Sequence, residues 1–403
     1  MFAVRRHRRS IAPLLAVLLP VCLVLGVWLG GHPGNLPGFA RDALVGDSEG
    51  RLYDEALDVI AENYYRPVDK DALLDEGLAA GVESLDDRFS AYFDPKAYRE
   101  FEQASHGAFE GVGMNVAEVK RGLRVITVFE GSPAARGGIR AGDVITAVDG
   151  DSLAGKTSEQ ATTRIKGRAG TVVRLTVVTG NEDPRDIELR RARVDVPAVE
   201  AAMKTSGAGK VAHVRLAGFT SGAHGEVRQA VDELLGKGAK GVVLDLRNNG
   251  GGLLNEAVLV SSIFVGDGTI VSTKGRARPR RVFEATGNPI DADIPVVVLV
   301  NRQSASASEI VTGALQDRQR AEVIGTRTFG KGVFQEIRRL SNGGALDITV
   351  GEYYTPKGRN LGGGGVKQGA GIRPDVRAED DADTKRRDEA LEVAVQTVAR
   401  GLT

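Results

Sequence analysis

Two short, strongly apolar runs, at residues 242–246 and 295–300, fix the fold of this chain more firmly than any other feature of its sequence. Runs of this kind are typical of strands that are buried on both faces of a sheet. A stretch with helical periodicity follows each run, at residues 253–264 and 306–315. Because strands and helices alternate in this half of the chain, we predict an α/β domain over residues 195–380.

The N-terminal end of the chain has the pattern of a membrane anchor. A basic cluster at residues 5–9 precedes 20 residues without a charge, 11–30, and a helix of that length spans a hydrocarbon core of about 30 Å. Because basic residues stay on the cytoplasmic side, we expect residues 1–38 to form a cytoplasmic stub, one transmembrane helix and a linker. The rest of the chain would then be extracytoplasmic, held to the cell membrane by a single pass. A cleaved signal peptide is the alternative.

The composition argues against several classes of function. Basic and acidic residues balance at 53 each, whereas nucleic-acid-binding proteins carry a basic surplus or stripe. The single cysteine, Cys22, lies inside the apolar stretch, so the exported part has no thiol nucleophile and no disulfide. No histidine pair has the spacing of a zinc motif. We therefore expect no nucleic-acid partner, no metal and no cofactor.

Three further segments differ in character from the α/β domain. Residues 39–106 carry apolar side chains with helical spacing, and we predict an N-terminal helical region there. Residues 107–194 contain short β-like runs separated by glycine-rich turns, as small β domains do. Residues 381–403 form a helix-like tail that either packs on the core or mediates self-association. A homo-oligomer is therefore one of the alternatives for this chain.

Two glycine-containing motifs identify the kind of β domain expected at residues 107–194. The first is a loop of four residues: Gly111, Val112, Gly113 and Met114. The second motif runs through residues 131–134 into 138–145, and together the two resemble a PDZ domain. Such a domain binds a peptide C-terminus as an added strand, while the N–H groups of the loop hold the carboxylate. Lys166, at a predicted helix end, would add positive charge to that site or simply be solvated.

Ser306 and Lys331, 25 residues apart, are the predicted centre of the chemistry. A serine hydroxyl is a weak nucleophile until a base accepts its proton. None of the five histidines lies in a triad-like motif. A lysine can act instead when burial or a nearby cation lowers its pKa from about 10.4 toward roughly 7 to 8. Ser306 with Glu309 also fits a capping box, which by itself would give the serine only a structural role.

Ala307, Gly251 and Gln335 complete the predicted site. The N–H of Ala307 lies at a helix N-terminus, where the helix dipole favours a developing negative charge. A second N–H for this oxyanion hole would come from Gly251, in the glycine-rich turn after the first apolar run. If residues 329–335 are extended, Gln335 projects from the same face as Lys331 and can hold its amine by a hydrogen bond.

Taken together, the motifs resemble the carboxyl-terminal processing peptidases, a serine/lysine protease family with an embedded PDZ domain. Besides the PDZ segment, the resemblance is carried by residues 87–93, 245–254, 304–317, 329–335, 353–358 and 371–375. It implies a crotonase-like α/β protease core with an inserted PDZ domain, and cleavage of proteins near their C-termini. In that family the residues that match Ser306, Lys331 and Gln335 are the nucleophile, the general base and the base-positioning residue. The sequence departs from the family pattern at Gly250, where a proline is common.

Two other functions remain open at this level. Residues 325–331 nearly match a Walker A loop, which would make the chain a P-loop-like nucleotide-binding protein. Against that reading, Gly332 stands where such a loop needs serine or threonine, and residues 333–340 look extended where its helix would begin. The other alternative is a catalytically silent PDZ scaffold that binds peptide C-termini as an adaptor. The sequence does not identify the natural substrates or any activating adaptor protein.

Overall fold

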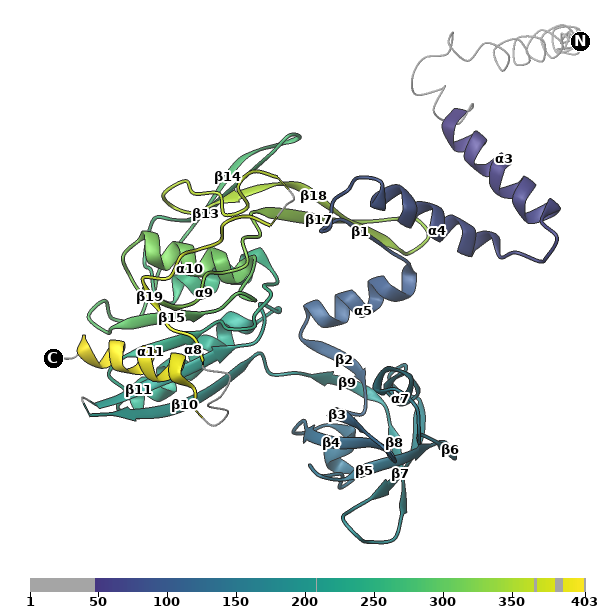
Figure 1. Cartoon of the computed structure of the whole chain (residues 1–403), viewed down its shortest axis with the longest axis horizontal. Helices are drawn as coiled ribbons and strands as arrows, with labels where there is room; N and C mark the ends of the chain where they lie inside the picture. The colour runs from purple at the N-terminus through teal and green to yellow at the C-terminus, as the bar shows by residue number, and fades with distance from the viewer. Residues whose placement is uncertain (1–47, 208, 366–367, 381–386, 402–403) are drawn as a thin grey trace, which may run out of the picture. The chain divides into compact units, whose positions relative to one another are not determined.

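A computed structural model describes residues 48–207, 209–365, 368–380 and 387–401 of the chain (Figure 1). The expected membrane anchor at residues 11–30 lies outside the described residues. Within the described ranges, no helix combines the length and the apolar character that crossing a bilayer requires. The chain divides into two compact units, residues 1–81 and residues 82–403, which are treated separately below.

The described part of the first unit is helical, as the periodicity predicted. It contains α3 (Ser48–Asn63) and most of α4 (Lys70–Glu83). An ion pair of 2.6 Å joins Lys70 on α4 to Asp58 on α3. Gly77 lets the two helices approach closely, because a Cβ at that position would lie 1.8 Å from the hydroxyl oxygen of Tyr53.

The two apolar runs form the centre of a six-stranded sheet, which confirms the α/β prediction for this part of the chain. Its strands, in spatial order, are β10 (Val199–Ser206), β11 (Gly209–Leu216), β12 (Val242–Asp245), β15 (Val296–Val300), β16 (Glu322–Gly325) and β19 (Val376–Arg377). All neighbours pair in parallel except β10 and β11, which are antiparallel. Every residue of β12 and β15 is buried, as expected for strands covered on both faces.

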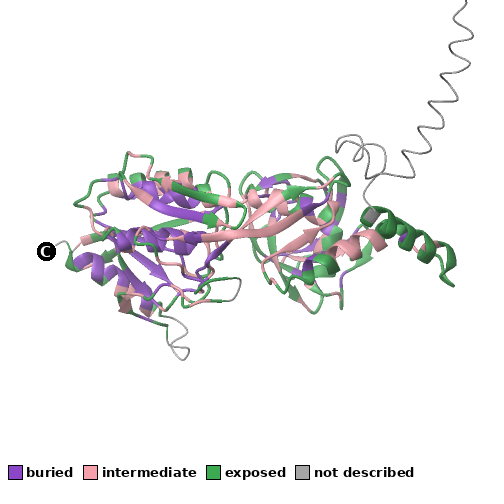
Figure 2. Cartoon of the chain, turned by 90° about the horizontal axis from the view of Figure 1, so that it is seen from above, coloured by how far each residue is buried: buried purple, intermediate pink, exposed green. Residues whose placement is uncertain are grey.

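Helices cover both faces of this sheet, and alternate strand residues point to each layer. The helices are α8 (Ala223–Gly236), α9 (Leu254–Ser262), α10 (Ala307–Asp317) and α11 (Glu389–Arg400). Val242 and Val298 pack in one cluster with residues of α8, α9 and α10. Val243 and Val297 face the other way and pack with residues of α11. Figure 2 shows the purple, buried residues concentrated in this sheet and its helices.

A second sheet lies on the far side of α9 and α10, so these two helices are enclosed between sheets (Figure 1). Its strands are β1 (Ala91–Phe93), β13 (Thr269–Gly275), β14 (Arg278–Glu284), β17 (Val333–Arg339) and β18 (Ala345–Tyr354). The long strand β18 pairs with β17 along one edge and with β1 and β13 along the other. It therefore links residues near position 91 to the segment that follows Lys331.

The inserted β domain has a hydrophobic core of its own, built around Leu123, Ile145 and Leu175. Its secondary structure comprises β3 (Met114–Val119), β4 (Gly122–Val128), α6 (Pro133–Arg136), β5 (Val144–Val148), β6 (Asp151–Ser152), α7 (Ser158–Ile165), β7 (Val172–Val178) and β8 (Arg185–Arg190). The chain enters after α5 (Pro95–Ser105) through β2 (Ala108–Gly111) and leaves through β9 (Ala192–Asp195). Because β2 and β9 pair with each other, the two ends of the insertion lie side by side.

Candidate active site

Three alternating serines, at positions 304, 306 and 308, run from the turn after β15 into the first turn of α10, and they differ in burial. Ser304 and Ser308 are fully buried. Their hydroxyls donate to the carbonyl oxygens of Leu246 and Asn249, each at 2.8 Å. Ser306, the predicted nucleophile, is only half-buried. The two flanking serines thus tie the turn to the end of β12, and Ser306 between them is partly exposed.

Ser306 has a strained backbone conformation. Its φ is 55° and its ψ is −114°, although residues with a Cβ avoid positive φ. Such strain persists only where the surrounding structure imposes it, and it is concentrated at functional sites. A sharp strand-to-helix turn of this kind presents a serine hydroxyl at the top of an α/β sheet in other hydrolases.

Gly251 lies directly against this turn. Its φ is 109°, and a Cβ at this position would lie 2.8 Å from the Cβ of Ser306 and 3.0 Å from the backbone nitrogen of Ala307. Real Cβ atoms do not approach other atoms so closely, so only glycine fits here. The structure therefore brings together Ser306, Ala307 and Gly251, as the sequence predicted.

The two predicted oxyanion donors are in different states. The N–H of Ala307, at the first residue of α10, has no hydrogen-bond partner among the described residues. The N–H of Gly251 instead donates to Oδ1 of Asn249 at 2.9 Å. In this conformation, one of the two donors is available to an oxyanion and the other is occupied.

Glu309 connects the serine turn to the lysine segment. Its side chain is fully buried on α10. Oε2 accepts the backbone N–H of Ser306 at 3.0 Å and that of Lys331 at 2.8 Å. Oε1 accepts the N–H of Gly330 at 2.7 Å and the hydroxyl of Thr328 at 2.6 Å. Burial raises the pKa of Glu309, whereas these four donors favour its charged form.

The surroundings of Lys331 act on the pKa of its ammonium group in two directions. Burial lowers the pKa of its ammonium group, while the carboxylates of Asp347, Asp87 and Glu309 act in the opposite direction. The net shift is downward, toward the neutral amine. The Nζ atom lies 4.8 Å from the centre of the Phe89 ring, so an aromatic face covers one side of it.

Gln335 does not hold the amine of Lys331 as we predicted. Its side-chain amide donates to Oγ1 of Thr349 at 2.9 Å, across the β17–β18 pair. The expectation assumed one regular strand from residue 329 onward. In the structure β17 begins only at Val333, and its register shifts between Phe334 and Gln335, so the simple alternation from Lys331 fails.

Several residues around Lys331 were given no role by the sequence reasoning. Asp87 accepts hydrogen bonds from the N–H of Phe89 and from the hydroxyl of Ser90. The Ser90 oxygen in turn accepts the N–H of Thr349 at 3.0 Å, which docks this segment on β18. Asp347 and Thr349 are polar residues two positions apart on one face of a strand. This pattern could have indicated that they face a polar site.

The predicted PDZ loop is shorter in the structure than the four residues expected, because only Val112 and Gly113 lie between β2 and β3. Gly113 has a φ of 85°, and a Cβ there would lie 2.2 Å from the Cβ of Ser132. Among the described residues, the N–H groups of Val112 and Gly113 have no partner, whereas Gly111 and Met114 lie in strands. Lys166 lines a cavity of about 800 Å³ beside β2, together with residues of α5. Free N–H groups in a glycine loop are what carboxylate binding requires.

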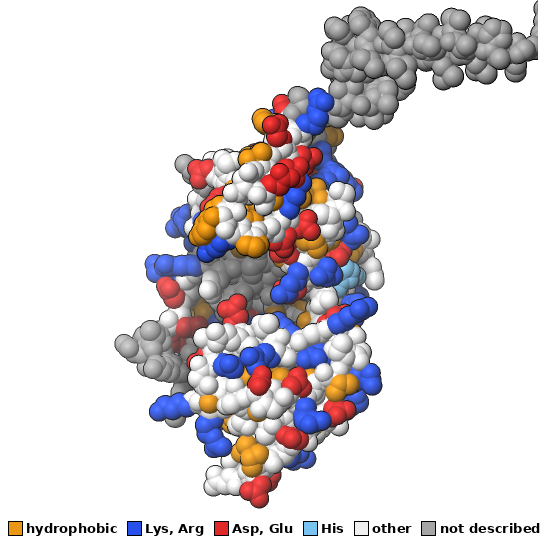
Figure 3. Space-filling model, turned by 90° about the vertical axis from the view of Figure 1, so that its right-hand side faces the viewer, with side chains coloured by type: hydrophobic (Ala, Val, Ile, Leu, Met, Phe, Trp, Pro, Cys, Tyr) orange, Lys and Arg blue, Asp and Glu red, His pale blue; other side chains and the backbone are white. Residues whose placement is uncertain are grey.

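The structure argues against the nucleotide-binding alternative. A Walker A lysine is followed by a helix whose N-terminus holds phosphate. Lys331 is instead followed by β17. In addition, Figure 3 shows Lys and Arg side chains interspersed with Asp and Glu on the face in view, without a continuous basic surface.

Comparisons with known proteins agree with this geometry. Peptidase family S41 matches residues 210–378, and the PDZ domain matches residues 103–178. A carboxy-terminal-processing protease of Bartonella bacilliformis is 35% identical over 333 residues, covering 81% of this chain and 74% of the relative. A CtpA-like serine protease of Staphylococcus aureus is 35% identical over 320 residues, covering 79% of this chain and 62% of the relative.

Solved structures show the same relationship. The photosystem II D1 C-terminal processing protease is 30% identical, with a TM-score of 0.50 over 88% of this chain and 97% of that protein. An S41 protease from Bacteroides fragilis has a TM-score of 0.52 over 85% of this chain and 92% of that protein, and at 18% identity it supports the fold alone. The chain therefore belongs to peptidase family S41, as a serine protease of the carboxy-terminal-processing group that carries an inserted PDZ domain.

Proposed function

We propose that this protein is a membrane-anchored, extracytoplasmic serine endopeptidase. It recognises protein C-termini through its PDZ domain and cleaves near them by a serine/lysine acyl-enzyme mechanism. The observation that carries the proposal is the double hydrogen bond of Glu309, which places the backbones of Ser306 and Lys331 at one carboxylate oxygen. The anchor and the location rest on the sequence of residues 1–38.

Acylation uses Ser306 as nucleophile and Lys331 as base. The neutral amine of Lys331 accepts the hydroxyl proton as Oγ of Ser306 forms a bond to the scissile carbonyl carbon. The tetrahedral intermediate then breaks its C–N bond, and the leaving amine takes the proton from the Lys331 ammonium. The result is an ester between Ser306 and the N-terminal part of the substrate. The half-buried position of Lys331 supports this role, because its desolvation lowers the pKa and favours the unprotonated amine.

Backbone N–H groups stabilise the negative oxygen of the intermediate. Ala307 supplies one donor, and its N–H has no other partner among the described residues. Gly251 supplies the second donor once its N–H is released from Asn249. A preorganised donor is worth several kcal/mol in the transition state, roughly 3 to 4 for a typical oxyanion hole. A shift of this turn would therefore change the rate strongly.

Deacylation repeats the chemistry with water. Lys331 accepts a proton from water as its oxygen attacks the ester carbon, and the serine oxygen leaves with the proton that Lys331 then returns. The products are a new C-terminal carboxylate and the free Ser306 hydroxyl. Gln335 acts as the base-positioning residue indirectly, through its hydrogen bond to Thr349 on β18 beside the lysine.

The PDZ loop recognises the end of the substrate. The free N–H groups of Val112 and Gly113 would hold the terminal carboxylate, with Gly111 and Met114 forming the ends of the loop. Lys166 would contribute positive charge from the wall of the neighbouring cavity. The PDZ domain would therefore bind the C-terminus of the substrate, and the α/β domain would cleave its chain.

The test is cleavage of an unstructured model protein by the full-length chain in detergent. The wild type is expected to trim the protein near its C-terminus, while Ser306→Ala and Lys331→Ala are expected to lose detectable cleavage and remain folded. Ser341→Ala and Lys240→Ala, at exposed positions, serve as matched controls. Near-normal cleavage by either dyad variant would exclude the mechanism.

A second arm tests recognition of the substrate end. The same substrate with an amidated C-terminus is expected to be cleaved more slowly, because the amide lacks the charge that the PDZ loop holds. Binding of free C-termini with no cleavage by the wild type would instead favour the silent scaffold. Equal cleavage of both substrates would remove the PDZ loop from the proposal.

A further inference from the structure

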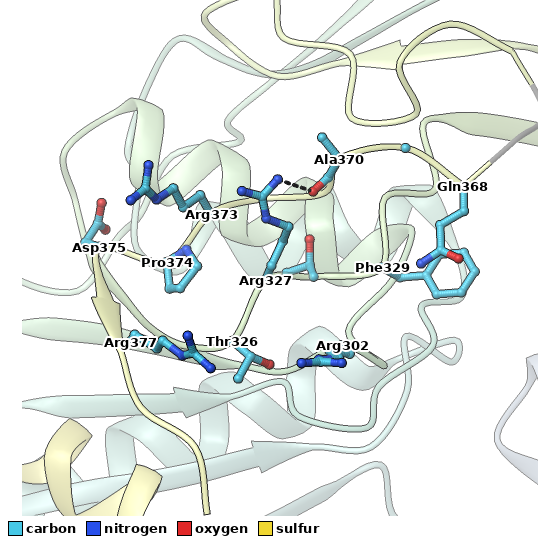
Figure 4. A pocket seen from close by; sticks show the side chains of 12 residues that line it. Arg302, Thr326, Arg327, Phe329, Gln368, Ala370, Arg373, Pro374, Asp375 and Arg377 are labelled. Atoms are coloured by element: carbon cyan, nitrogen blue, oxygen red, sulfur yellow. Dashed lines mark hydrogen bonds between the residues drawn. The ribbon is translucent and has the colours of Figure 1, made fainter.

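An arginine-rich cavity of about 780 Å³ opens beside the segment that leads to Lys331 (Figure 4). We call it the basic groove, and its defining residues are Arg302, Arg327, Arg373, Arg377, Thr326 and Phe329. In Figure 4, Arg302 and Arg377 lie on either side of Thr326, with Arg327 above them. Phe329 and Gln368 close one end of the groove, and Asp375 lies at the other.

The positive charge of the groove is largely uncompensated. Among the described residues, Arg302 and Arg373 form no ion pair and no side-chain hydrogen bond, and Arg327 donates only to the carbonyl of Ala370 at 3.1 Å. Arg377 pairs with Glu379 at 3.3 Å. The carboxylate in the lining, Asp375, accepts hydrogen bonds from Gln316 and from the backbone N–H of Val323. The lining therefore carries four guanidinium groups and one carboxylate, and Glu379, outside the lining, pairs with one of the four.

The groove shares two chain segments with the proposed catalytic centre, although Ser306 and Lys331 do not line it. Arg302 follows β15 and Thr326 follows β16, so both lie at the carboxyl ends of parallel strands, where α/β proteins bind their ligands. Ser306 lies in the same turn as Arg302. At the other wall, Phe329 precedes Lys331 by two residues and donates its N–H to the carbonyl of Ser304 at 3.0 Å. One end of the groove, at Phe329, is therefore close in sequence to Lys331 and hydrogen-bonded to the turn that carries Ser306, so a chain bound at the dyad can extend into the groove.

The arrangement of the arginines fits an extended acidic chain better than a single anion. A phosphate site gathers several donors around one point, commonly from backbone N–H groups. Here four exposed arginine side chains line one cavity, and in Figure 4 they lie apart from one another rather than around one point, which suits carboxylates spaced along a peptide.

We propose that the basic groove binds aspartate and glutamate side chains of the substrate on one side of the scissile bond. This inference rests on the proposed function for the identity of the bound chain. The enzyme is accordingly selective for cleavage sites with an acidic flank. Exposed charge pairs are individually weak, so several together give a selectivity of roughly fivefold to tenfold.

The first experiment measures cleavage of matched unstructured substrates by the full-length enzyme. Three residues flanking the mapped cleavage site are changed to Asp, Asn or Lys. The wild type is expected to cleave the Asp substrate roughly fivefold to tenfold faster, in kcat/KM, than the Asn substrate at low salt. That preference should disappear near 1 M salt, where charges are screened within about 3 Å.

Reversing the charge of the groove is the more decisive test of its substrate preference. The double variant Arg302→Glu with Arg373→Glu is expected to prefer the Lys substrate over the Asp substrate. Neither side chain forms an ion pair or a hydrogen bond with a described residue, and the bond that Arg373 accepts from Gln316 is to its backbone carbonyl, so the reversal removes no polar side-chain contact. Arg276→Glu, at an exposed turn of the same unit, is the matched control and should keep the wild-type preference. An unchanged preference in the double variant would overturn the inference.

A binding experiment separates this inference from the proposed function. The full-length Ser306→Ala variant is titrated into fluorescent peptides with three Asp or three Asn residues, each with an amidated C-terminus that the PDZ loop does not hold. Tighter binding of the Asp peptide, lost on charge reversal, supports the groove even if the wild type cleaves nothing. Equal binding of both peptides, or selective binding of inorganic phosphate or an oligonucleotide instead, refutes the groove even if cleavage occurs.

Discussion

Ser306 and Lys331 donate their backbone N–H groups to the same carboxylate oxygen of Glu309, at 3.0 and 2.8 Å. The two residues belong to different elements, one to the turn before α10 and the other to the segment before β17. A buried carboxylate thus holds both backbones in place before substrate arrives. Such preorganisation is what catalysis by positioned groups requires, since small displacements are costly in rate.

Replacing Glu309 should therefore lower kcat/KM by more than the loss of folded protein accounts for. Glu309→Gln keeps the volume but turns an amide N–H₂ group toward backbone donors, leaving at least one of them unpaired. An unsatisfied buried donor costs about 1 to 3 kcal/mol, so we expect the free energy of unfolding to fall by that amount. We expect kcat/KM to fall at least tenfold, measured under conditions where urea titration shows the variant folded.

The matched control for Glu309 is Glu322→Gln, at an exposed position on β16. It should change neither the free energy of unfolding nor kcat/KM appreciably. If Glu309→Gln retained wild-type kcat/KM while losing stability, the carboxylate would be a structural clamp without influence on the dyad.

Gly250 and Gly251 are adjacent glycines with opposite expected responses to alanine. At Gly251, with a φ of 109°, a Cβ would lie 2.8 Å from the Cβ of Ser306. At Gly250, a Cβ would meet no atom within 4 Å, and the φ lies outside the left-handed region. We expect Gly251→Ala to abolish cleavage, and Gly250→Ala to keep it.

The stability of the two glycine variants should diverge as well. Gly250→Ala restricts the unfolded chain and should raise the free energy of unfolding by about 0.4 to 1 kcal/mol. Gly251→Ala should lower it, because the backbone has to shift. Thermal unfolding and cleavage rates of both variants check this pair. An active Gly251→Ala enzyme would mean that the turn is not part of the active site.

The sequence predicted the α/β core well because its signal is local. Residues 242–246 and 295–300 are apolar except for Asp245, and the structure pairs residues 242–245 with residues 296–299 as buried, adjacent parallel strands. The meeting of Ser306, Ala307 and Gly251 followed from the same reasoning, since strand ends of one parallel sheet lie at one edge. These predictions needed only strand periodicity and helix starts.

The surroundings of Lys331 were harder to predict because they depend on long-range pairing. Phe89 reaches the lysine only through the docking of its segment on β18, more than 200 residues away in sequence. Gln335 was misplaced because the register shift at Phe334 is not visible as a change in polarity. Glu309 was recognised as a capping residue, but nothing local indicates that its second oxygen accepts from residues 328 and 330.

The pH dependence of cleavage should report the lysine. Only the neutral amine of Lys331 accepts a proton, and burial lowers its pKa below the usual 10.5. We expect kcat/KM to rise tenfold per pH unit on the acid side and to level off below pH 10.5. Lys331→Arg should be inactive throughout, because a guanidinium stays charged. A flat profile from pH 5 to 10 would contradict a lysine base.

The same shift predicts how Lys331 affects stability. Between its folded pKa and the unfolded value near 10.5, the unfolded state binds more protons, so this group makes the free energy of unfolding rise with pH. Lys331→Met, of similar length, should be more stable than the wild type at pH 7. The difference should shrink as the pH approaches 10.5. A constant difference across urea titrations at pH 7 and pH 10 would mean that the pKa is not lowered.

Asp245 at the end of β12 should make the free energy of unfolding rise with pH in the same sense as Lys331, but in the acid range. Burial alone would raise its pKa, but hydrogen bonds from His213 and Arg247 lower it from 3.8 to about 2. The resulting stabilisation is present above pH 3.8 and is lost as the pH falls through 2. It amounts to about 2 kcal/mol, because one pKa unit corresponds to about 1.4 kcal/mol.

Asp245→Asn should therefore lower the free energy of unfolding by about 2 kcal/mol or more at pH 6. The gap to the wild type should narrow by about 1 kcal/mol at pH 3, where the wild-type carboxylate has lost part of its advantage. Because Arg247 also pairs with Asp388 just before α11, hydrogen exchange should show that helix opening more readily in the variant. Asp232→Asn, which breaks an exposed pair with Arg228 on α8, should cost no more than about 0.5 kcal/mol at either pH. If the gap between wild type and Asp245→Asn were the same at pH 6 and pH 3, the low pKa of this carboxylate would be refuted, and with it the charged anchor that joins β12 to the C-terminal helix.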